Sequence, residues 1–256
     1  MTTKTILIPL PEYGFDPTEA AIPWKLLSDR QHVVQFATPD GKPAAADKLM
    51  LSGQKLGIWK PVLKARKDAV DAYSQMLESK AFANPLKYSA VQETDFSAIL
   101  LPGGHDKSIK IYLESATLQQ LVASFFSVNK PVAAICHGVV LAARSIQPES
   151  GNSVLHGYKT TALLKSQEML AYHLTRLWLK DYYLTYPEIS VEDEVRSVLA
   201  NKQDFLVGPK PLFKDSPDNL ARGFALRDRN YVSARWPGDV YNFVFELLRL
   251  LENDTS

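Results

Sequence analysis

The chain contains one cysteine, Cys136, and a histidine follows it directly in the sequence AICHGVV. A buried strand is predicted to end at Cys136 and a helix to begin at about Gly138, so the cysteine lies on a tight, strained turn with its side chain exposed. The helix N-terminus and His137 both favour the thiolate, which is the nucleophilic form. The alternative is a small buried apolar residue, as free cysteines often are. The adjoining His137 and Gly138 favour the reactive thiol.

A second group of residues follows another predicted strand, in the sequence Pro102-Gly103-Gly104-His105. Paired glycines let backbone N–H groups point into a shared space, which predicts an oxyanion site at Gly103 and Gly104. A plain glycine turn is the alternative. His105 either contacts substrate or caps the turn.

Glu19 is the third candidate, in Asp16-Pro17-Thr18-Glu19. This pattern is typical of a helix start, with Asp16 as the N-cap and Glu19 completing a capping box. The strand before it points its carboxyl end at the same sheet edge as Cys136. A carboxyl group there can hydrogen-bond the sulfur, and it is then expected to be protonated. Both roles are open to Glu19.

The elements that must position these residues alternate between strands and helices. Near-continuous apolar runs predict strands covered on both faces, as in parallel sheets, at residues 4–10, 33–38, 96–102 and 131–136. Helical patterns are predicted at residues 17–30, 62–82, 117–128 and directly after Cys136. This alternation indicates βαβ units and an α/β fold, a three-layer α/β/α sandwich with a mostly parallel sheet.

The second half is less regular. Residues 158–164 are interpreted as a strand, and residues 224–228 and 231–235 as a hairpin. Helices are predicted at 166–182, 190–201 and 239–252. We expect one domain over residues 1–256, with helical insertions near 45–90 and 165–215.

Composition restricts the classes of function. The chain has 256 residues, with 29 Lys and Arg against 28 Asp and Glu, so the formal net charge of +1 gives no reason to expect nucleic-acid binding. No apolar run approaches the length of a membrane span or of a signal peptide. One cysteine allows no intramolecular disulfide, which fits a reducing, cytoplasmic location. The other histidines show no metal-ligand spacing and no phosphate-binding motif occurs, so neither a metal ion nor a cofactor is expected.

Taken together, five segments resemble the ThiJ/PfpI superfamily within the class I glutamine amidotransferase-like fold, which is flavodoxin-like. They are ILIPLPEYGFDPTEAAIPWKLL, FATPDG, DFSAILLPGGHDKS, KPVAAICHGVVLAARS and YVSARWPGD, spread from residue 6 to residue 239. The resemblance implies that Cys136 is the reactive cysteine, with His137 beside it and Glu19 contacting the sulfur. It also implies an oxyanion site at Gly104 and the His137 backbone N–H. The length resembles the larger stress-induced chaperone and glyoxalase III branch, and a homodimer is expected from this resemblance only.

In that branch a later acid completes a Cys-His-acid triad. Counting seven residues on from Thr161 in TALLKSQE places Glu168 at the matching position. Ala162 and Leu163 stand where the branch commonly has Gly-Phe. Glu168 is therefore either the third member of a triad or a solvated helix residue.

The resemblance implies a cofactor-free enzyme acting on small reactive carbonyl compounds, converting methylglyoxal to lactate without glutathione. The same cysteine and histidine also suit an amidase or deglycase. Two non-enzymatic alternatives are a holdase chaperone and an oxidative-stress sensor acting through Cys136. The aromatic stretch from Tyr172 to Tyr186 is the candidate chaperone surface, although packing or a dimer interface explains it as well.

Overall fold

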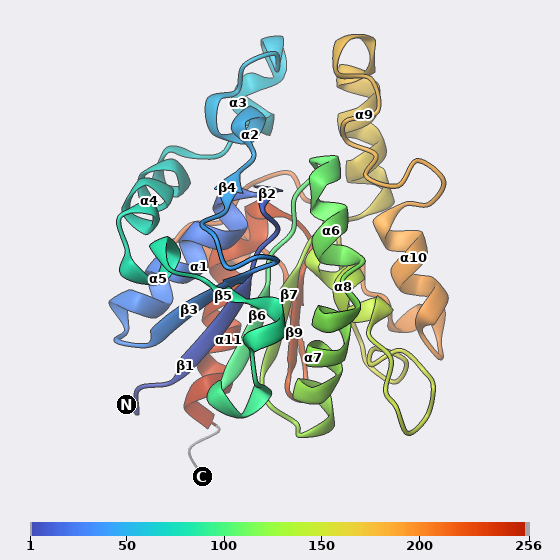
Figure 1. Cartoon of the computed structure of the whole chain (residues 1–256). Coiled ribbons are helices and arrows are strands. Elements are labelled where there is room, and N and C mark those ends of the chain that lie inside the picture. Colours follow the sequence, from blue (N-terminus) through green and yellow to red (C-terminus); the bar gives the residue numbers. More distant parts are fainter. Residues whose placement is uncertain (1, 254–256) are drawn as a thin grey trace.

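A computed structural model describes residues 2–253 and shows a central sheet in the order β5-β3-β1-β6-β7-β9-β8 (Figure 1). Every neighbouring pair is parallel except β8 with β9, which pair antiparallel as the predicted hairpin. The strand bounds are β1 Thr5–Pro9, β3 Val33–Thr38, β5 Leu86–Lys87, β6 Ala98–Leu101, β7 Val132–Ile135, β8 Ala225–Asp228 and β9 Tyr231–Ala234.

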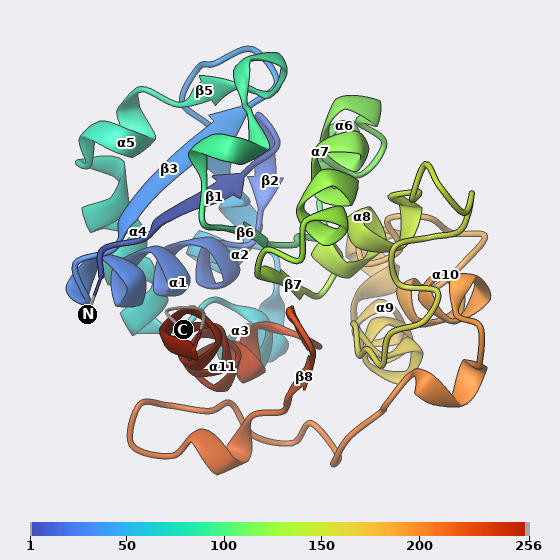
Figure 2. The ribbon, with the colours of Figure 1, turned by 90° about the horizontal axis from the view of Figure 1, so that it is seen from below.

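Helices cover both faces of this sheet, as Figures 1 and 2 show from two directions. Helices α1 (Pro17–Asp29) and α11 (Val240–Asn253) lie on one face, and α7 (Ala116–Ser127) and α8 (Gly138–Arg144) lie on the other. Strands β6 and β7 are buried along their whole length because both of their faces are covered. The predicted α/β/α sandwich with a mostly parallel sheet is confirmed.

The chain leaves β1 toward β3 on one side and later leaves β6 toward β7 on the other, so the strand order reverses between β1 and β6. Ligands of such sheets bind outside the carboxyl ends of the strands at this reversal. The segments after β1, β6 and β7 carry Glu19, Gly103 and Cys136. The topology therefore brings together residues that are far apart in sequence.

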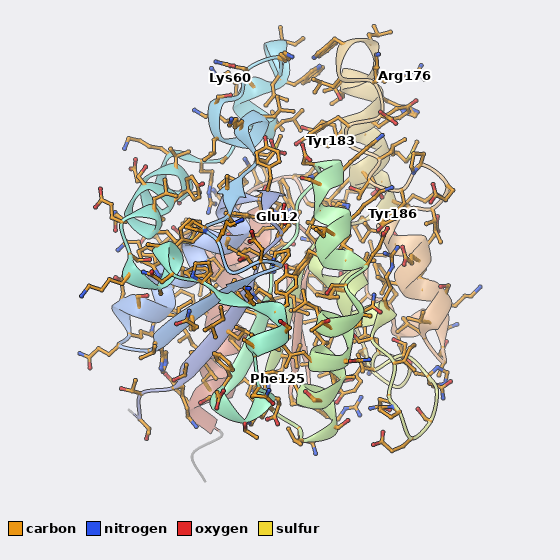
Figure 3. All side chains as sticks on the ribbon, viewed as in Figure 1. Glu12, Lys60, Phe125, Arg176, Tyr183 and Tyr186 are labelled. Carbon is orange, nitrogen blue, oxygen red and sulfur yellow. The ribbon has the colours of Figure 1, made fainter. Side chains whose placement is uncertain are left out.

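Two helical segments rise beyond the carboxyl ends of the strands, at the top of Figure 1. One contains α2 (Lys48–Ser52) and α3 (Lys60–Leu63), and the other contains α9 (Lys165–Leu179), which α10 (Val191–Val198) follows. An apolar cluster of Met50, Leu56 and Tyr183 joins the two segments. The labelled Tyr183 lies between them in Figure 3.

Two predicted elements differ from the structure. The helix expected at 62–82 is divided into α3, α4 (Lys67–Leu77) and α5 (Lys80–Ala83), since Arg66 and Ser79 have extended backbone. The strand expected at 158–164 is wrong: only Thr160 forms an isolated bridge, with Phe205. Flanking N–H groups there donate to the side chains of Asp228 and Ser233, so no strand ladder is needed.

A small second sheet was not predicted. It pairs β2 (Tyr13–Phe15) with β4 (Ala45–Ala46), and each strand is too short for an alternating pattern to reveal it. Its position fixes the path of the chain between β1 and α1, immediately before Asp16. It also carries the chain from β3 up to α2.

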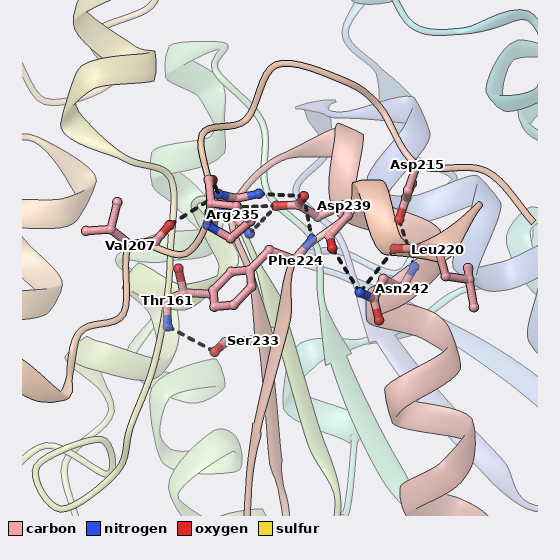
Figure 4. A network of polar contacts seen from close by, with 11 residues as sticks. Thr161, Val207, Asp215, Leu220, Phe224, Ser233, Arg235, Asp239 and Asn242 are labelled. Atoms are coloured by element: carbon pink, nitrogen blue, oxygen red, sulfur yellow. Dashed lines mark hydrogen bonds and ion pairs between the residues drawn. The ribbon is translucent and has the colours of Figure 1, made fainter.

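A fully buried ion pair fastens the last long loop to the end of the sheet (Figure 4). Arg235 donates from Nε to Asp239 Oδ2 at 2.8 Å and from Nη2 to Asp239 Oδ1 at 2.9 Å. Its Nη1 donates to the carbonyl oxygens of Val207 and Pro209. Asp239 also accepts the N–H of Phe224. Every polar group of the pair is used, which burial of two charges requires.

Candidate active site

Cys136 occupies a strained turn between β7 and α8. Its φ of +56° lies in the left-handed region, which non-glycine residues rarely adopt. Gly138 makes the turn possible, because a Cβ atom there would lie 2.0 Å from the carbonyl oxygen of Leu101. The predicted strained turn is confirmed. The predicted exposure is wrong, since only 1% of Cys136 is exposed.

The thiol of Cys136 is held in its neutral form. Burial raises the pKa of Cys136 well above its usual value, and the charges of Glu19 and Asp16 act in the same direction. The backbone N–H of His137 opposes this rise. The expectation of a depressed thiol pKa is therefore wrong, because removal from water outweighs the favourable dipole at the start of the short helix α8.

Glu19 connects the turn after β6 with the cysteine. Its Oε2 accepts the N–H of Gly103 at 2.8 Å. Burial raises the pKa of Glu19 well above its usual range and the Asp16 charge adds to this, while hydrogen bonds from Gly103 and from the Cys136 thiol act against it. Glu19 therefore holds its proton to a higher pH than an ordinary carboxyl group, next to the sulfur. This geometry agrees with the sulfur contact that the family resemblance implied.

The predicted capping arrangement is half formed. Asp16 Oδ1 accepts the N–H groups of Thr18 at 2.7 Å and Glu19 at 3.2 Å, so Asp16 is the N-cap of α1. The Asp16 N–H donates to the carbonyl oxygen of Gly103 at 2.8 Å and not to Glu19. The Glu19 carboxyl is thereby free to face the cysteine.

The two glycines after β6 differ in what they offer. The N–H of Gly103 was expected as an oxyanion donor, but Glu19 already accepts it. Gly103 is needed for close packing instead, since a Cβ atom would lie 2.7 Å from the His137 nitrogen. Within residues 2–253, the Gly104 N–H has no acceptor, so it and the His137 N–H are the candidate oxyanion donors.

His137 lies between the thiol and a hydroxyl group. Its Nδ1 is 3.4 Å from Cys136 Sγ, and its Nε2 is 3.0 Å from Thr185 Oγ1. Thr185 also donates to the carbonyl oxygen of His105 at 3.3 Å. Because the hydroxyl has one hydrogen, we assign the tautomer in which His137 Nε2–H donates to Thr185. Nδ1 then carries a lone pair directed at the thiol.

Thr185 takes the place at which a triad would have an acid. The sequence offered no signal for it, because it lies in an irregular segment between α9 and α10 with no motif around it. Glu168 was the predicted acid, and the structure places it elsewhere. Its Oε2 accepts the N–H of Val191, the first residue of α10, at 3.1 Å. In the described chain Glu168 makes no hydrogen bond to His137, so the expected triad contact is not formed.

Glu168 is nevertheless no solvated helix residue. It is 1% exposed, and burial raises its pKa to about 7. Its position near the start of α9 directs it at the start of α10, where its carboxylate satisfies an unpaired helical N–H group. The Glu168 side chain therefore links α9 to α10.

His105 packs against the rings of His137 and Tyr183. Its ring centroid lies 5.0 Å from that of His137 and 5.0 Å from that of Tyr183. Burial lowers the pKa of His105 to about 4, and burial also holds the pKa of His137 well below its usual value. Both imidazoles are thus neutral near pH 7. His105 therefore lies beside His137. The sequence alone left open whether His105 contacts substrate or caps a turn.

A cavity of about 200 Å³ opens between the two helical segments above this site. His105 and Asp16 contribute to its wall, whereas Cys136 does not line it. Most of the wall is apolar, and cationic groups lie at one side. Its lining includes Leu63, Arg66, Leu170, Leu174, Lys214 and Trp236.

Comparisons with known proteins agree with this geometry. The ThiJ/PfpI family-like profile matches residues 10–209. The protein/nucleic acid deglycase HchA of Staphylococcus aureus is 25% identical over 221 residues, which cover 81% of this chain and 70% of that protein. An uncharacterized Schizosaccharomyces pombe protein, C14C4.04, is 28% identical over 184 residues, covering 68% of this chain and 67% of that one.

A solved structure shares the fold. Glyoxalase III from Candida albicans superposes with a TM-score of 0.70 at 16% identity, covering 96% of this chain and 97% of that chain. Helices on both sides of a mostly parallel sheet are common to the two. The family profile spans β6, β7 and the Cys136 turn together with α1. The chain belongs to the ThiJ/PfpI family.

Proposed function

We propose that this protein is a cofactor-free, cysteine-dependent enzyme for small reactive carbonyl compounds, with methylglyoxal as the test substrate. The observation that carries the proposal is the placement of the Cys136 thiol between the protonated Glu19 carboxyl and the Nδ1 lone pair of His137. A neutral thiol, a base and an acid at one carbon centre are what addition to an aldehyde requires.

The proposed reaction begins when His137 Nδ1 takes the proton of the Cys136 thiol as the sulfur adds to the aldehyde carbon. The aldehyde oxygen receives a proton from Glu19, which gives a neutral hemithioacetal. The Gly104 and His137 N–H groups face the developing charge on that oxygen. The raised pKa of Cys136 suits this step, since the buried thiol keeps its proton until a substrate arrives.

Glu19, now a carboxylate, then removes the proton from the first carbon of the hemithioacetal while protonated His137 gives its proton to the ketone oxygen, which forms an enediol. Glu19 returns its proton to the second carbon, and His137 accepts the proton of the hydroxyl group on the first carbon. The product is a thioester of lactate on Cys136. Water hydrolyses this thioester, which releases lactate and restores the thiol. Overall, one methylglyoxal and one water give one lactate and one proton, and no electrons enter or leave.

The experiment is glutathione-free turnover of methylglyoxal, followed as lactate formed. We expect Cys136→Ala to lower kcat/KM by at least about 1,000-fold, as removal of a nucleophile commonly does. His173→Ala is the matched control, since His173 is exposed on α9 and outside the site. Full activity in Cys136→Ala would sink the proposal, as would an inactive wild-type protein.

Hydrolysis of carbonyl adducts on amines is the second candidate. The relative named as a protein/nucleic acid deglycase supports it, and so does a cavity with more room than methylglyoxal needs. The same thiol would attack the adduct carbon and release the amine. Incubation with methylglyoxal-treated N-acetyl-lysine distinguishes it, provided that free methylglyoxal is trapped chemically during the assay.

The non-enzymatic alternatives find less support. Of the aromatic stretch, Tyr183 is 3% exposed and Tyr182 donates to Asp47 of the facing segment, so packing accounts for these two side chains. Leu177 and Trp178 in the same stretch are exposed. A thiol with a raised pKa also reacts slowly with peroxide, which disfavours the sensor. In residues 2–253 no helix is long and apolar enough to cross a bilayer. The homodimer and the cytoplasmic location stay predictions.

A further inference from the structure

The geometry points to a zinc site built from His105, Cys136 and His137, which we propose as a reversible block on the thiol. One ligand atom from each of these residues lies within 4.8 Å of the other two. No spacing pattern in the sequence indicates the site, since His105 lies 31 positions away from Cys136. The turn after β6 and the turn after β7 bring the three side chains together.

Distances between the ligand atoms are close to those of a bound zinc ion. Tetrahedral zinc with one sulfur at about 2.3 Å and nitrogens at about 2.0 Å places sulfur and nitrogen roughly 3.5 Å apart. Cys136 Sγ and His137 Nδ1 are 3.4 Å apart. All three ligand atoms lie within 4.8 Å of one another, so the widest pair must approach by up to about 1.3 Å for zinc to contact all three.

His105 offers an independent indication of a ligand. It is 9% exposed, and its Nδ1 is buried with no hydrogen-bond partner in the described chain. A buried polar atom without a partner is costly, so a ligand that it could bind would offset that cost.

Groups around the three residues suit metal binding. His137 donates from Nε2 to Thr185 while its Nδ1 faces the sulfur, which is the way metal-bound histidines are commonly oriented. His105 also lines the cavity above the site, so one of the three ligand residues borders a space that can hold water. Three protein ligands and one open position are typical of accessible zinc sites.

Binding displaces one proton. The zinc ion takes the thiolate of Cys136, the thiol proton leaves to solvent, and both imidazoles bind as neutral ligands without losing a proton. No electron is transferred. Sulfur that is bound to zinc no longer attacks a carbonyl carbon, so zinc would inhibit chemistry at Cys136 and a chelator would restore it.

The test is a zinc titration of chelator-treated protein in competition with a chromophoric indicator. We expect one site per chain in the wild type, and a loss of affinity of at least about 100-fold in Cys136→Ala and in His105→Ala, which remove ligands. His156→Ala and His173→Ala are controls, because both histidines are exposed and lie outside the site. Equal affinity in wild type and Cys136→Ala would overturn the proposal.

Cobalt gives a readout that needs no variant to fold. Co²⁺ bound to wild-type protein should show a thiolate-to-cobalt charge-transfer band in the near ultraviolet, and zinc should abolish it. Absence of that band at one equivalent of Co²⁺ would count against a sulfur ligand and overturn the assignment. Neither measurement depends on turnover, so failure of the proposed carbonyl chemistry and failure of the zinc site are told apart.

Discussion

The imidazole of His137 donates from Nε2 to the hydroxyl of Thr185 across 3.0 Å, at the position where a carboxylate would complete a triad. A threonine fixes the tautomer of the ring as an acid does, because its own hydrogen is directed to the carbonyl oxygen of His105. It does not stabilise a positive charge on the ring as an acid would. The base in this site is therefore oriented but weak, which matches the lowered pKa of His137.

Replacement of Thr185 tests that orienting role. We expect Thr185→Val to lower kcat about 10- to 100-fold with little change in KM. Valine has nearly the same volume as threonine, but it lacks the hydroxyl group that fixes the tautomer of the His137 ring. Thr185→Ser retains the hydroxyl and should restore most of the rate. Steady-state kinetics on methylglyoxal measure both. A Ser variant as slow as the Val variant would show that the methyl group matters and the hydroxyl does not.

The raised thiol pKa predicts how Cys136 reacts with an alkylating agent. Because the thiolate is the reactive form, the rate with iodoacetamide should rise about tenfold per pH unit through neutrality, without a plateau below the ordinary thiol pKa of 9.0. Intact-mass measurements over time give the rate. Urea-unfolded protein is the control, and its rate should level off at a lower pH. A plateau in the native protein below neutral pH would contradict the burial argument.

Glu168 should make the protein less stable as pH rises. Burial raises its pKa from an ordinary 4.5 to about 7 in the folded state, so the folded state binds the proton more tightly. The free energy of unfolding therefore falls between pH 4.5 and about 7, by roughly 1–3 kcal/mol, and this contribution is constant above that window. Glu168→Gln keeps an acceptor for Val191 and should remove this part of the slope.

Urea unfolding of wild type and Glu168→Gln across that pH range measures the difference. Subtraction is needed because His105 acts with the opposite sign: its pKa is lowered to about 4, so its contribution grows as pH rises from there toward its ordinary 6.5. Wild type and Glu168→Gln both contain His105, so its contribution cancels when one stability curve is subtracted from the other. Parallel stability curves for the two proteins would show that the Glu168 carboxyl does not titrate in this window.

The buried pair at the end of β9 should be sensitive to the loss of one partner. Arg235→Met leaves the Asp239 carboxylate buried without its cation, and removal of one member of a buried pair costs about 3–5 kcal/mol of unfolding free energy. Lys67→Met is a matched control, because Lys67 and Asp71 have the same i,i+4 spacing as Arg235 and Asp239 but are exposed. Chemical unfolding should show little change for it. Similar losses in both variants would contradict the argument.

The sequence by itself determined the layers of the fold and the central turn. Apolar runs such as those of β1 and β6 identify strands buried on both faces, and the spacing of Asp16 and Pro17 identifies the start of α1, because both signals are local. The strained turn at Cys136 was equally readable, since a strand pattern stops there and a helix pattern begins at Gly138.

Only the tertiary structure decided the protonation states and the partners. Burial sets the pKa values of Cys136, Glu19 and His137, and the local sequence around them predicted a thiolate that burial prevents. Thr185 reaches His137 across 48 positions through a segment without regular structure, so no spacing rule could find it. Long-range packing, which places irregular loops and excludes water, determines which side chains meet and which carry charge.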